Sequence, residues 1–289
     1  MRTLLLSIAL TSLLAACASA PKVAPAPAVP IAPAVPAAPA GPPANDDLNA
    51  VAWTQTAIEH DLIYREVYRR AGEKLAAALK DRNWDALPKG DRKDAKVARL
   101  KPAIIVDIDE TVLDNSPYEA RQMLQQKTHD SSGWADWCRE KSARALPGAR
   151  EFAEQAAKSG VTMFYVSNRT KDLADVTLDN LRAQGFPIAA NETVFLGLGA
   201  EVEGCTPVGN SKSCRRELIG RTYRVVMMFG DQLGDFVDLP ANTVDGRREA
   251  ISPYMDWIGE RWFVLPNPMY GSWETALFNN DLKLPVEQR

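Results

Sequence analysis

Four short apolar runs, each ending in polar residues, are the clearest pattern in the 289-residue sequence. They lie at Ala103–Asp107, Val161–Ser167, Arg224–Asp231 and Arg261–Pro266. Continuous runs of this length and composition are typical of strands buried on both faces of a parallel sheet. Between them, Pro147–Gly160 and Lys171–Gly185 have the composition of helices that end in glycine. The alternation predicts an α/β fold with a largely parallel sheet flanked by helices.

A smaller, mostly helical region is predicted ahead of the sheet, within residues 45–100. Apolar residues recur at steps of three and four over Asn45–Asp81. Asn45 or Asp46 can cap the start of this helix. We expect Gly72 to break or bend it, because glycine is a poor helix former.

The N-terminus has the pattern of a targeting segment. Residues 1–16 carry Arg2 and then an apolar stretch too short to span a bilayer, as in a secretory signal peptide. "LAAC", which ends at Cys17, resembles a bacterial lipobox and implies cleavage before Cys17 and lipid attachment to it. A plain signal peptide with an incidental cysteine is the alternative. Ala18, by resemblance to enteric sorting rules, favours the outer membrane.

Residues 17–44 follow as a segment rich in proline and alanine. Such a segment forms neither a helix nor a central strand, so it predicts a semi-extended tether. The folded domain is expected over residues 45–289. Together these segments predict an outer-membrane lipoprotein of the bacterial cell envelope, facing the periplasm or the surface.

Charge and composition exclude several classes of function. The net charge of -3 gives no basic surface of the kind that binds nucleic acid, so we expect no nucleic-acid partner. The sequence contains two histidines, His60 and His129, too few for a histidine-rich metal cluster. Neither histidine lies in an RHG motif, which argues against a histidine acid phosphatase.

Polar side chains follow three of the predicted strands at the point where each strand ends. Asp107 and Asp109 end the first, Ser167–Arg169 the second, and Asp231 and Asp235 the third. Ligands of open parallel sheets bind beyond the carboxyl ends of the strands, where these residues should converge. Clustered carboxylates without histidines suit a hard divalent cation, of which Mg²⁺ is our expectation. A cation there also offsets the mutual repulsion of the carboxylates.

The order DxDxT, a serine after a second strand, a lysine and then GDxxxD resembles the haloacid dehalogenase (HAD) superfamily, with its Rossmann-like core. The motifs "DIDETVLDNSPY", "RALPGA", "YVSNR", "SKSCRR", "GDQLGDF" and "LPNPMYGSWE" narrow the resemblance to the class C acid phosphatases. These are secreted bacterial lipoproteins that act on nucleoside monophosphates. The resemblance covers roughly Asp47 to the C-terminus.

That resemblance implies covalent phosphoryl transfer at the carboxyl ends of the predicted strands, which we call the rim of the sheet. Asp107 would be the nucleophile, and Asp109 the acid and then the base. Asp107, the backbone carbonyl of Asp109, and Asp231 would hold Mg²⁺. Asp235 would lie in or near that metal shell and would orient Lys212 or a metal-bound water.

The remaining polar groups of the rim would bind the phosphoryl group. Ser167 and Asn168 would donate hydrogen bonds to its oxygens, with Arg169 beside them. Lys212 would supply positive charge. Arg215 and Arg216, which follow Lys212 closely in the same motif, are the competing candidates for that role.

Substrate recognition is expected from aromatic side chains. Core packing is the commoner use of such residues. In the family that the chain resembles, aromatics at the places of Trp137 and Tyr270 clamp a nucleobase or another aromatic leaving group. The substrate is therefore expected to be a phosphomonoester, with nucleoside monophosphates as the first candidates. The resemblance also suggests a homodimer. Glu110 and Asp114 have no assigned role.

Three cysteines lie in the folded region. Cys205 and Cys214 flank a short loop and can form a disulfide in an oxidising compartment, which would leave Cys138 free. A zinc site is disfavoured because the sequence has no CxxC pair with a nearby histidine. The pairing itself stays open at the level of sequence.

Two alternative functions also remain. One is a phosphotransferase or phosphomutase that uses Asp107 with a sugar acceptor instead of water. The other is a surface lipoprotein that binds a ligand on a degenerate HAD fold. Loss of a catalytic residue would favour the second reading, and none is missing from the motifs.

Overall fold

The computed structural model describes residues 45, 47–93, 96–127, 130–285 and 288, all within one compact unit of the chain. The predicted signal peptide, the tether, Cys17 and the alternative cap Asp46 lie outside the described residues. Within the described part, no helix is both long and apolar enough to cross a bilayer.

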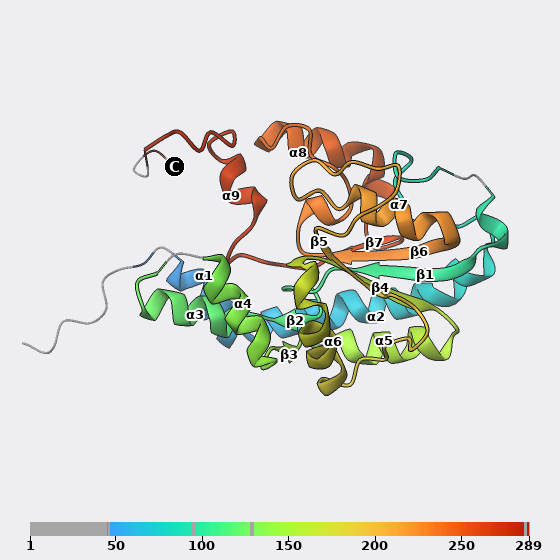
Figure 1. Cartoon of the computed structure of the whole chain (residues 1–289), viewed down its shortest axis with the longest axis horizontal. Coiled ribbons are helices and arrows are strands. Elements are labelled where there is room, and N and C mark those ends of the chain that lie inside the picture. The colour runs from blue at the N-terminus through green and yellow to red at the C-terminus, as the bar shows by residue number, and fades with distance from the viewer. Residues whose placement is uncertain (1–44, 46, 94–95, 128–129, 286–287, 289) are drawn as a thin grey trace, which may run out of the picture. The chain divides into compact units, whose positions relative to one another are not determined.

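A five-stranded parallel sheet forms the centre of the fold (Figure 1). Its strands, in spatial order, are β5 (Phe195–Leu198), β4 (Thr162–Thr170), β1 (Lys101–Val106), β6 (Tyr223–Gly230) and β7 (Trp262–Val264). Every neighbouring pair is parallel. The α/β prediction and all four predicted strands are therefore confirmed.

Strand β5 is the element that the sequence pattern did not reveal. It has only four residues and lies at one edge of the sheet. Its sequence FLGL contains Gly197, where a Cβ atom would meet the Arg169 carbonyl at 2.7 Å and the Lys171 amide nitrogen at 2.9 Å. The glycine that weakens the strand pattern thus allows close packing against the end of β4.

Helices cover both faces of the sheet, with α2 and α5 on one face and α7 and α8 on the other (Figure 1). The helices are α1 (Leu48–Thr56), α2 (Ile58–Lys80), α3 (Ser116–Leu124), α4 (Ser131–Glu140), α5 (Ala149–Lys158), α6 (Ala174–Ala183), α7 (Ser213–Thr222), α8 (Val244–Ile251) and α9 (Ser272–Ala276). A small antiparallel pair, β2 (Leu113–Asp114) and β3 (Arg144–Ala145), connects the segment after β1 to the segment before α5. Both predicted inter-strand helices, α5 and α6, are present, and each is followed by a glycine with positive φ, Gly160 or Gly185.

The N-terminal helix breaks at Ala57, not at Gly72 as predicted. Ala57 has extended backbone angles, whereas α2 continues through Gly72. The glycine serves packing, because a Cβ atom there would meet the Gln155 side chain at 2.7 Å. The Gln155 Nε2 donates a hydrogen bond to the Gly72 carbonyl at 3.1 Å, which joins α2 to α5.

Helix α2 supports the loop that follows β1. Tyr68 is stacked on Phe229 of β6, and its hydroxyl donates to the Thr111 carbonyl at 2.7 Å. The Tyr64 hydroxyl donates to the Glu110 carbonyl. The N-terminal helical region therefore stabilises the loop that follows β1 at the rim of the sheet.

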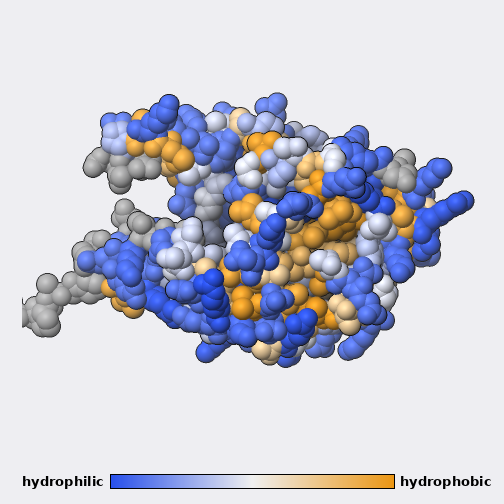
Figure 2. Space-filling view, in the orientation of Figure 1, coloured by the Kyte–Doolittle hydropathy of each residue, from blue (hydrophilic) through white to orange (hydrophobic). Residues whose placement is uncertain are grey.

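The carboxyl ends of the strands open onto a hollow in the molecular surface. In Figure 1 the strands run toward the side where α9 and the α1–α3 region lie. Figure 2 shows the described surface hollowed between these two groups of helices, with mostly polar residues around it. A polar hollow at this edge is where the sequence placed the functional residues.

Candidate active site

Asp107 is the first residue after β1 and lies at the centre of the rim. Its amide donates to the Phe229 carbonyl at 3.0 Å, which continues the sheet pairing by one residue. Its carboxylate pairs with the Lys212 ammonium, and Lys212 Nζ also lies 2.7 Å from Asp235 Oδ1. All three side chains are buried. The structure thus brings together three residues that are far apart in the sequence.

Burial and charge oppose each other in this ion cluster. Burial raises the pKa of Asp107 well above its usual range, although Lys212 acts against this. For Lys212, burial would lower the pKa, but the charges of Asp107 and Asp235 raise it above its ordinary value. Lys212 is therefore held as a cation beside the nucleophile candidate.

The two arginines near Lys212 have other contacts, so the prediction for that lysine gains geometric support. Arg216 pairs with Asp91 at 2.5 Å. Arg215 donates to the Ser167 carbonyl at 2.6 Å and to Asn168 Oδ1 at 2.7 Å. Arg215 thereby holds the end of β4 against α7.

Three carboxylates at the rim could hold a metal ion. Asp107, Asp231 and Asp235 each offer an oxygen atom, and these atoms lie within 4.8 Å of one another. Burial and the charge of Asp235 raise the pKa of Asp231 to about 7. An all-oxygen, anionic donor set fits a hard divalent cation.

Asp235 is held differently from the other two. Its Oδ1 accepts from Lys212 at 2.7 Å, and its Oδ2 accepts from the backbone N–H of Gln232 at 2.8 Å. It also packs against Gly230, where any Cβ atom would lie 2.3 Å from Asp235 Oδ2. Asp235 therefore contacts Lys212 and also belongs to the carboxylate group that could hold a metal ion, so both of its predicted roles stay predictions.

Asp109 lies beside this cluster and its side chain is held by several donors. Asn115 Nδ2 and the Arg169 Nε and Nη2 atoms approach Asp109 Oδ1 at 2.9, 3.0 and 2.8 Å. Ser167 Oγ donates to Oδ2 at 3.2 Å. The Asp109 carboxylate therefore has a fixed orientation, as an acid and base requires.

Ser167 and Arg169 accordingly contact Asp109 in the structure. Arg169 has no exposed side-chain surface. Burial would lower the pKa of Arg169, but the charge and hydrogen bond of Asp109, together with other nearby groups, raise it above the ordinary value. Asn168, between them, is exposed, and Arg215 fixes its amide. Direct contacts of these three residues with a phosphoryl group stay predictions.

The two aromatic candidates differ in exposure. Trp137 is only 3% exposed, and its Nε1 donates to Asn115 Oδ1 at 2.8 Å. Tyr270 is half-buried, and its carbonyl accepts from Gln232 Nε2 at 3.2 Å. Trp134, which the sequence reading did not favour, is half-buried and lies under the Arg169 guanidinium, 5.6 Å from ring centroid to Cζ. The clamp of Trp137 and Tyr270 stays a prediction.

Glu110 and Asp114, without a role at the level of sequence, shape the loop. Glu110 is buried with φ of 53°, and its Oε1 accepts from the Asn115 amide at 2.7 Å. Burial and the nearby Asp109 raise the pKa of Glu110 well above its usual range. Asp114 Oδ1 accepts from the Ser116 amide at 2.9 Å, at the start of α3. Both residues turn the chain after the nucleophile candidate.

The disulfide that the sequence left open is present. Cys205 and Cys214 are bonded, with their Cα atoms 5.6 Å apart, and Cys138 is free and buried. Cys214 lies two residues after Lys212. The bridge therefore closes the loop that leads to Lys212.

Three amide side chains of the site were missed by the sequence reading. Asn115, Gln232 and Asn267 contact Asp109 or Asp231, at distances between 2.8 and 2.9 Å. A signal existed for Asn267, because it follows the fourth predicted strand just as the acidic residues follow the others. Asn115 and Gln232 are ordinary turn residues in sequence, and only the fold reveals their contacts.

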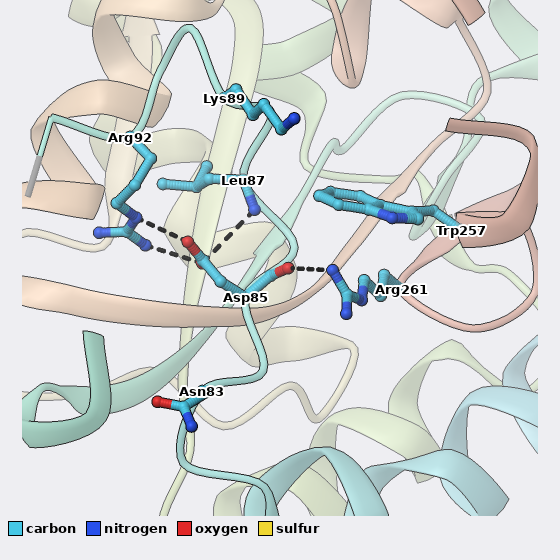
Figure 3. Close-up of a pocket in the computed structure, with 7 residues that line it drawn as sticks. All are labelled: Asn83, Asp85, Leu87, Lys89, Arg92, Trp257 and Arg261. Carbon is cyan, nitrogen blue, oxygen red and sulfur yellow. Dashed lines mark hydrogen bonds and ion pairs between the residues drawn. The ribbon is translucent and has the colours of Figure 1, made fainter. Parts of the chain in front are cut away.

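A separate pocket of about 270 Å³ lies away from this site (Figure 3). It is lined by Asn83, Asp85, Leu87, Lys89, Arg92, Trp257 and Arg261. Figure 3 shows Asp85 held by Arg92 through its carboxylate and by Arg261 through its carbonyl. The adjoining Ala86 amide pairs with the Val225 carbonyl near the start of β6, whereas Asp231 follows its end. This pocket therefore lies near the amino ends of the strands, opposite the candidate active site.

The site consists of an aspartate beyond a central parallel strand, a second aspartate two residues later, a lysine and one further pair of aspartates. This arrangement defines a site of the HAD type. A sequence model of "HAD superfamily, subfamily IIIB (Acid phosphatase)" matches residues 51–273. The chain belongs to this family. The expected HAD-like fold and family are thereby confirmed.

Solved structures and sequence relatives agree with this assignment. The class C acid phosphatase from Bacillus anthracis superposes with a TM-score of 0.70 and 34% identity, over 84% of this chain and 92% of that one. A second structure of that protein contains bound tungstate.

Plant relatives include a stem 28 kDa glycoprotein of Glycine max and acid phosphatase 1 of Solanum lycopersicum. The first is 28% identical over 59% of this chain, and the second is 25% identical over 57%. The matched regions span 60% and 57% of those relatives' own lengths.

Proposed function

We propose that the protein is a Mg²⁺-dependent phosphomonoesterase of the acid phosphatase class. The observation that carries this proposal is the buried contact of Asp107 with Lys212, beside Asp231 and Asp235. A nucleophile, a fixed cation and an oxygen-rich metal position are what phosphoryl transfer from an ester requires. The family membership and the tungstate bound by the Bacillus anthracis protein support it, because tungstate is a tetrahedral oxyanion like phosphate.

In the first step, a carboxylate oxygen of Asp107 attacks phosphorus. The bond between phosphorus and the ester oxygen breaks, and the phosphoryl group is transferred to Asp107 as an acyl phosphate. Asp109 donates its proton to the departing alcohol oxygen. The orientation that Arg169, Ser167 and Asn115 impose on Asp109 serves this proton transfer.

In the second step, water attacks the phosphorus of the acyl phosphate. Asp109 takes the proton from that water, and the bond between phosphorus and the Asp107 oxygen breaks. Inorganic phosphate leaves and the Asp107 carboxylate is regenerated. Lys212 remains charged throughout and attracts the phosphoryl oxygens toward Asp107.

Asp107, Asp231 and the backbone carbonyl of Asp109 are our proposed Mg²⁺ ligands, with Asp235 holding Lys212 next to them. A bound divalent cation supplies electrostatic stabilisation of the charge on the transferring phosphoryl group. The residues fit such a cation because each offers oxygen, and Asp107 and Asp231 are crowded carboxylates.

The proposed substrates are nucleoside monophosphates and other aromatic phosphomonoesters. The proposed clamp consists of Tyr270, which is half-buried near the rim, and Trp137, whose Nε1 donates to Asn115. The half-buried ring of Trp134, beside Arg169, is a further candidate for stacking. A homodimer remains the proposed oligomeric state.

We further propose that the protein is secreted and anchored to the outer membrane through lipid on Cys17. The support is the sequence of residues 1–44 alone. A Cys17→Ser protein expressed in a Gram-negative host is expected to leave the membrane fraction and to be recovered in the soluble fraction. Recovery in the membrane fraction at the wild-type level would refute the lipid assignment.

The proposed activity is tested by measuring phosphate release from nucleoside monophosphates, sugar phosphates and aryl phosphates. Activity should vanish with a chelator and return with Mg²⁺, and aromatic esters should have the lower KM. Activity that is indifferent to the chelator would refute the metal proposal. Transfer of phosphate to added sugar, without net release, would favour the phosphotransferase alternative.

A further inference from the structure

We infer that Asn267 and Gln232 are positioning residues that fix Asp231 for cation binding and join it to the segment carrying Tyr270. This inference rests on the proposed function, because it concerns how the proposed metal ligand is held. Neither residue has a hydrogen bond to Asp107 among the described residues, and neither is a predicted ligand.

Asp231 is held through one of its two oxygens. Asn267 Nδ2 and Gln232 Nε2 each lie 2.8 Å from Asp231 Oδ2. The other oxygen, Oδ1, has a long contact of 3.4 Å with the Thr111 hydroxyl. Two amide donors on Oδ2 leave Oδ1 as the oxygen available to a cation.

The same two amides also hold the backbone around Tyr270. Asn267 Oδ1 accepts from the Met269 amide at 3.0 Å and from the Tyr270 amide at 3.4 Å. Gln232 Nε2 donates to the Tyr270 carbonyl at 3.2 Å. Each amide therefore contacts the metal ligand candidate and the Tyr270 segment at once.

Both ends of this segment are packed tightly. The Pro266 carbonyl, at its start, accepts from the Tyr64 hydroxyl at 3.1 Å. At its end, Gly271 leaves no room for a side chain, since a Cβ atom would lie 2.3 Å from Gln232 Oε1. Because Asn267 lies between these two fixed ends and contacts both neighbours, we expect its loss to affect Tyr270 and Asp231 together.

Side chains that orient metal ligands usually affect metal affinity strongly when they are removed. Asn267→Ala and Gln232→Ala should each weaken Mg²⁺ binding by about 10- to 100-fold. Because the Tyr270 backbone also loses an anchor, KM for an aryl phosphate should stay raised even when saturating Mg²⁺ restores most of kcat. A purely structural role would change thermal stability without this pattern.

Asn242 provides a matched control. It is also a partly buried asparagine that holds this region, since its Nδ2 donates to the Ser272 carbonyl and to the Thr275 hydroxyl at 2.8 Å. It makes no described contact with Asp231. Asn242→Ala is expected to bind Mg²⁺ within about twofold of the wild type, a change below the effect expected for removal of an orienting residue.

The test is calorimetric titration of the full chain with Mg²⁺ alone, alongside thermal unfolding of each variant. Weakened binding in both the Asn267 and Gln232 variants, with normal binding in the Asn242 variant, supports the inference. Wild-type affinity in a folded Asn267→Ala or Gln232→Ala protein overturns it; if one variant does not fold, the other decides. If the wild type itself binds no Mg²⁺, the metal proposal fails first and this inference fails with it.

Discussion

At the scale of single residues, the site is a set of charges that are stable only together. Lys212 pairs with both Asp107 and Asp235. Arg169 pairs with Asp109. Removing one partner from a buried pair leaves the other charge unpaired, which costs several kcal/mol. The crowded carboxylates of "DIDET" are therefore offset by two different cations, Lys212 beside Asp107 and Arg169 beside Asp109.

Lys212→Gln tests the cation beside the nucleophile candidate. Glutamine keeps most of the length but removes the charge that stabilises the phosphoryl group, so kcat/KM should fall about 10²- to 10³-fold. The measurement is steady-state turnover of an aryl phosphate at saturating Mg²⁺. Lys89→Gln, an exposed lysine at the opposite edge of the sheet, is the control. Equal turnover of both variants would exclude a role for Lys212.

At the scale of elements, the hydrophobic pattern was sufficient for four of the five strands of the parallel sheet and for the helices α5 and α6. The runs in β1, β4 and β6 are long enough to be recognised, whereas the four residues of β5 are not. The break predicted at Gly72 was wrong because this glycine provides room for the side chain of Gln155 on α5, a contact that the sequence does not reveal. The acidic residues could be found from the carboxyl ends of strands, but the amides of Gln232 and Asn267 gain their partners only through tertiary structure.

The support that α2 gives to the catalytic loop can be measured. Tyr64→Phe removes a hydroxyl that donates to the carbonyls of Glu110 and Pro266. Leaving buried carbonyls unpaired should lower the free energy of unfolding by about 1–3 kcal/mol. Tyr165→Phe is the matched control, because the buried Tyr165 hydroxyl has no hydrogen-bond partner among the described residues.

Urea unfolding of the two variants decides the question. The Tyr165→Phe protein should stay within about 0.5 kcal/mol of the wild type, as expected where no special feature is lost. A Tyr64→Phe protein as stable as that control would show that α2 does not brace the loop.

At the scale of the whole molecule, the folded part combines a stable sheet with a rim that burial and like charges destabilise. Functional sites commonly keep such groups for chemistry at the expense of stability. The fold and the acidic rim were predictable because strand pattern and strand order place them. The targeting role of residues 1–44 stays a prediction from the sequence, because these residues lie outside the described part of the chain.

A carboxyl away from the site predicts a pH dependence of stability. Burial, with Asp47 and Glu274 nearby, raises the pKa of Glu119 to about 7 from a usual value of 4.5. The folded state therefore holds this proton more tightly than the unfolded state, so its stabilising effect is full below pH 4.5 and is lost as the pH rises to about 7.

Glu119→Gln should accordingly raise the free energy of unfolding at pH 8, by about 1 kcal/mol after allowance for solvent screening. The gain over the wild type should disappear near pH 4. Glu201→Gln, whose side chain is 93% exposed, should show no such dependence. Thermal unfolding at both pH values is the measurement, and a constant difference between Glu119→Gln and the wild type would contradict the assignment.

The central claim is that Asp107 is the nucleophile, and Asp107→Asn tests it most directly. Asparagine keeps the shape of the side chain but cannot form the acyl phosphate. Phosphate release from an aryl phosphate, measured with saturating Mg²⁺, should fall at least about 10³-fold while thermal unfolding confirms an intact fold. Turnover by the folded Asp107→Asn protein within tenfold of the wild type, or about 1.4 kcal/mol, would contradict the account.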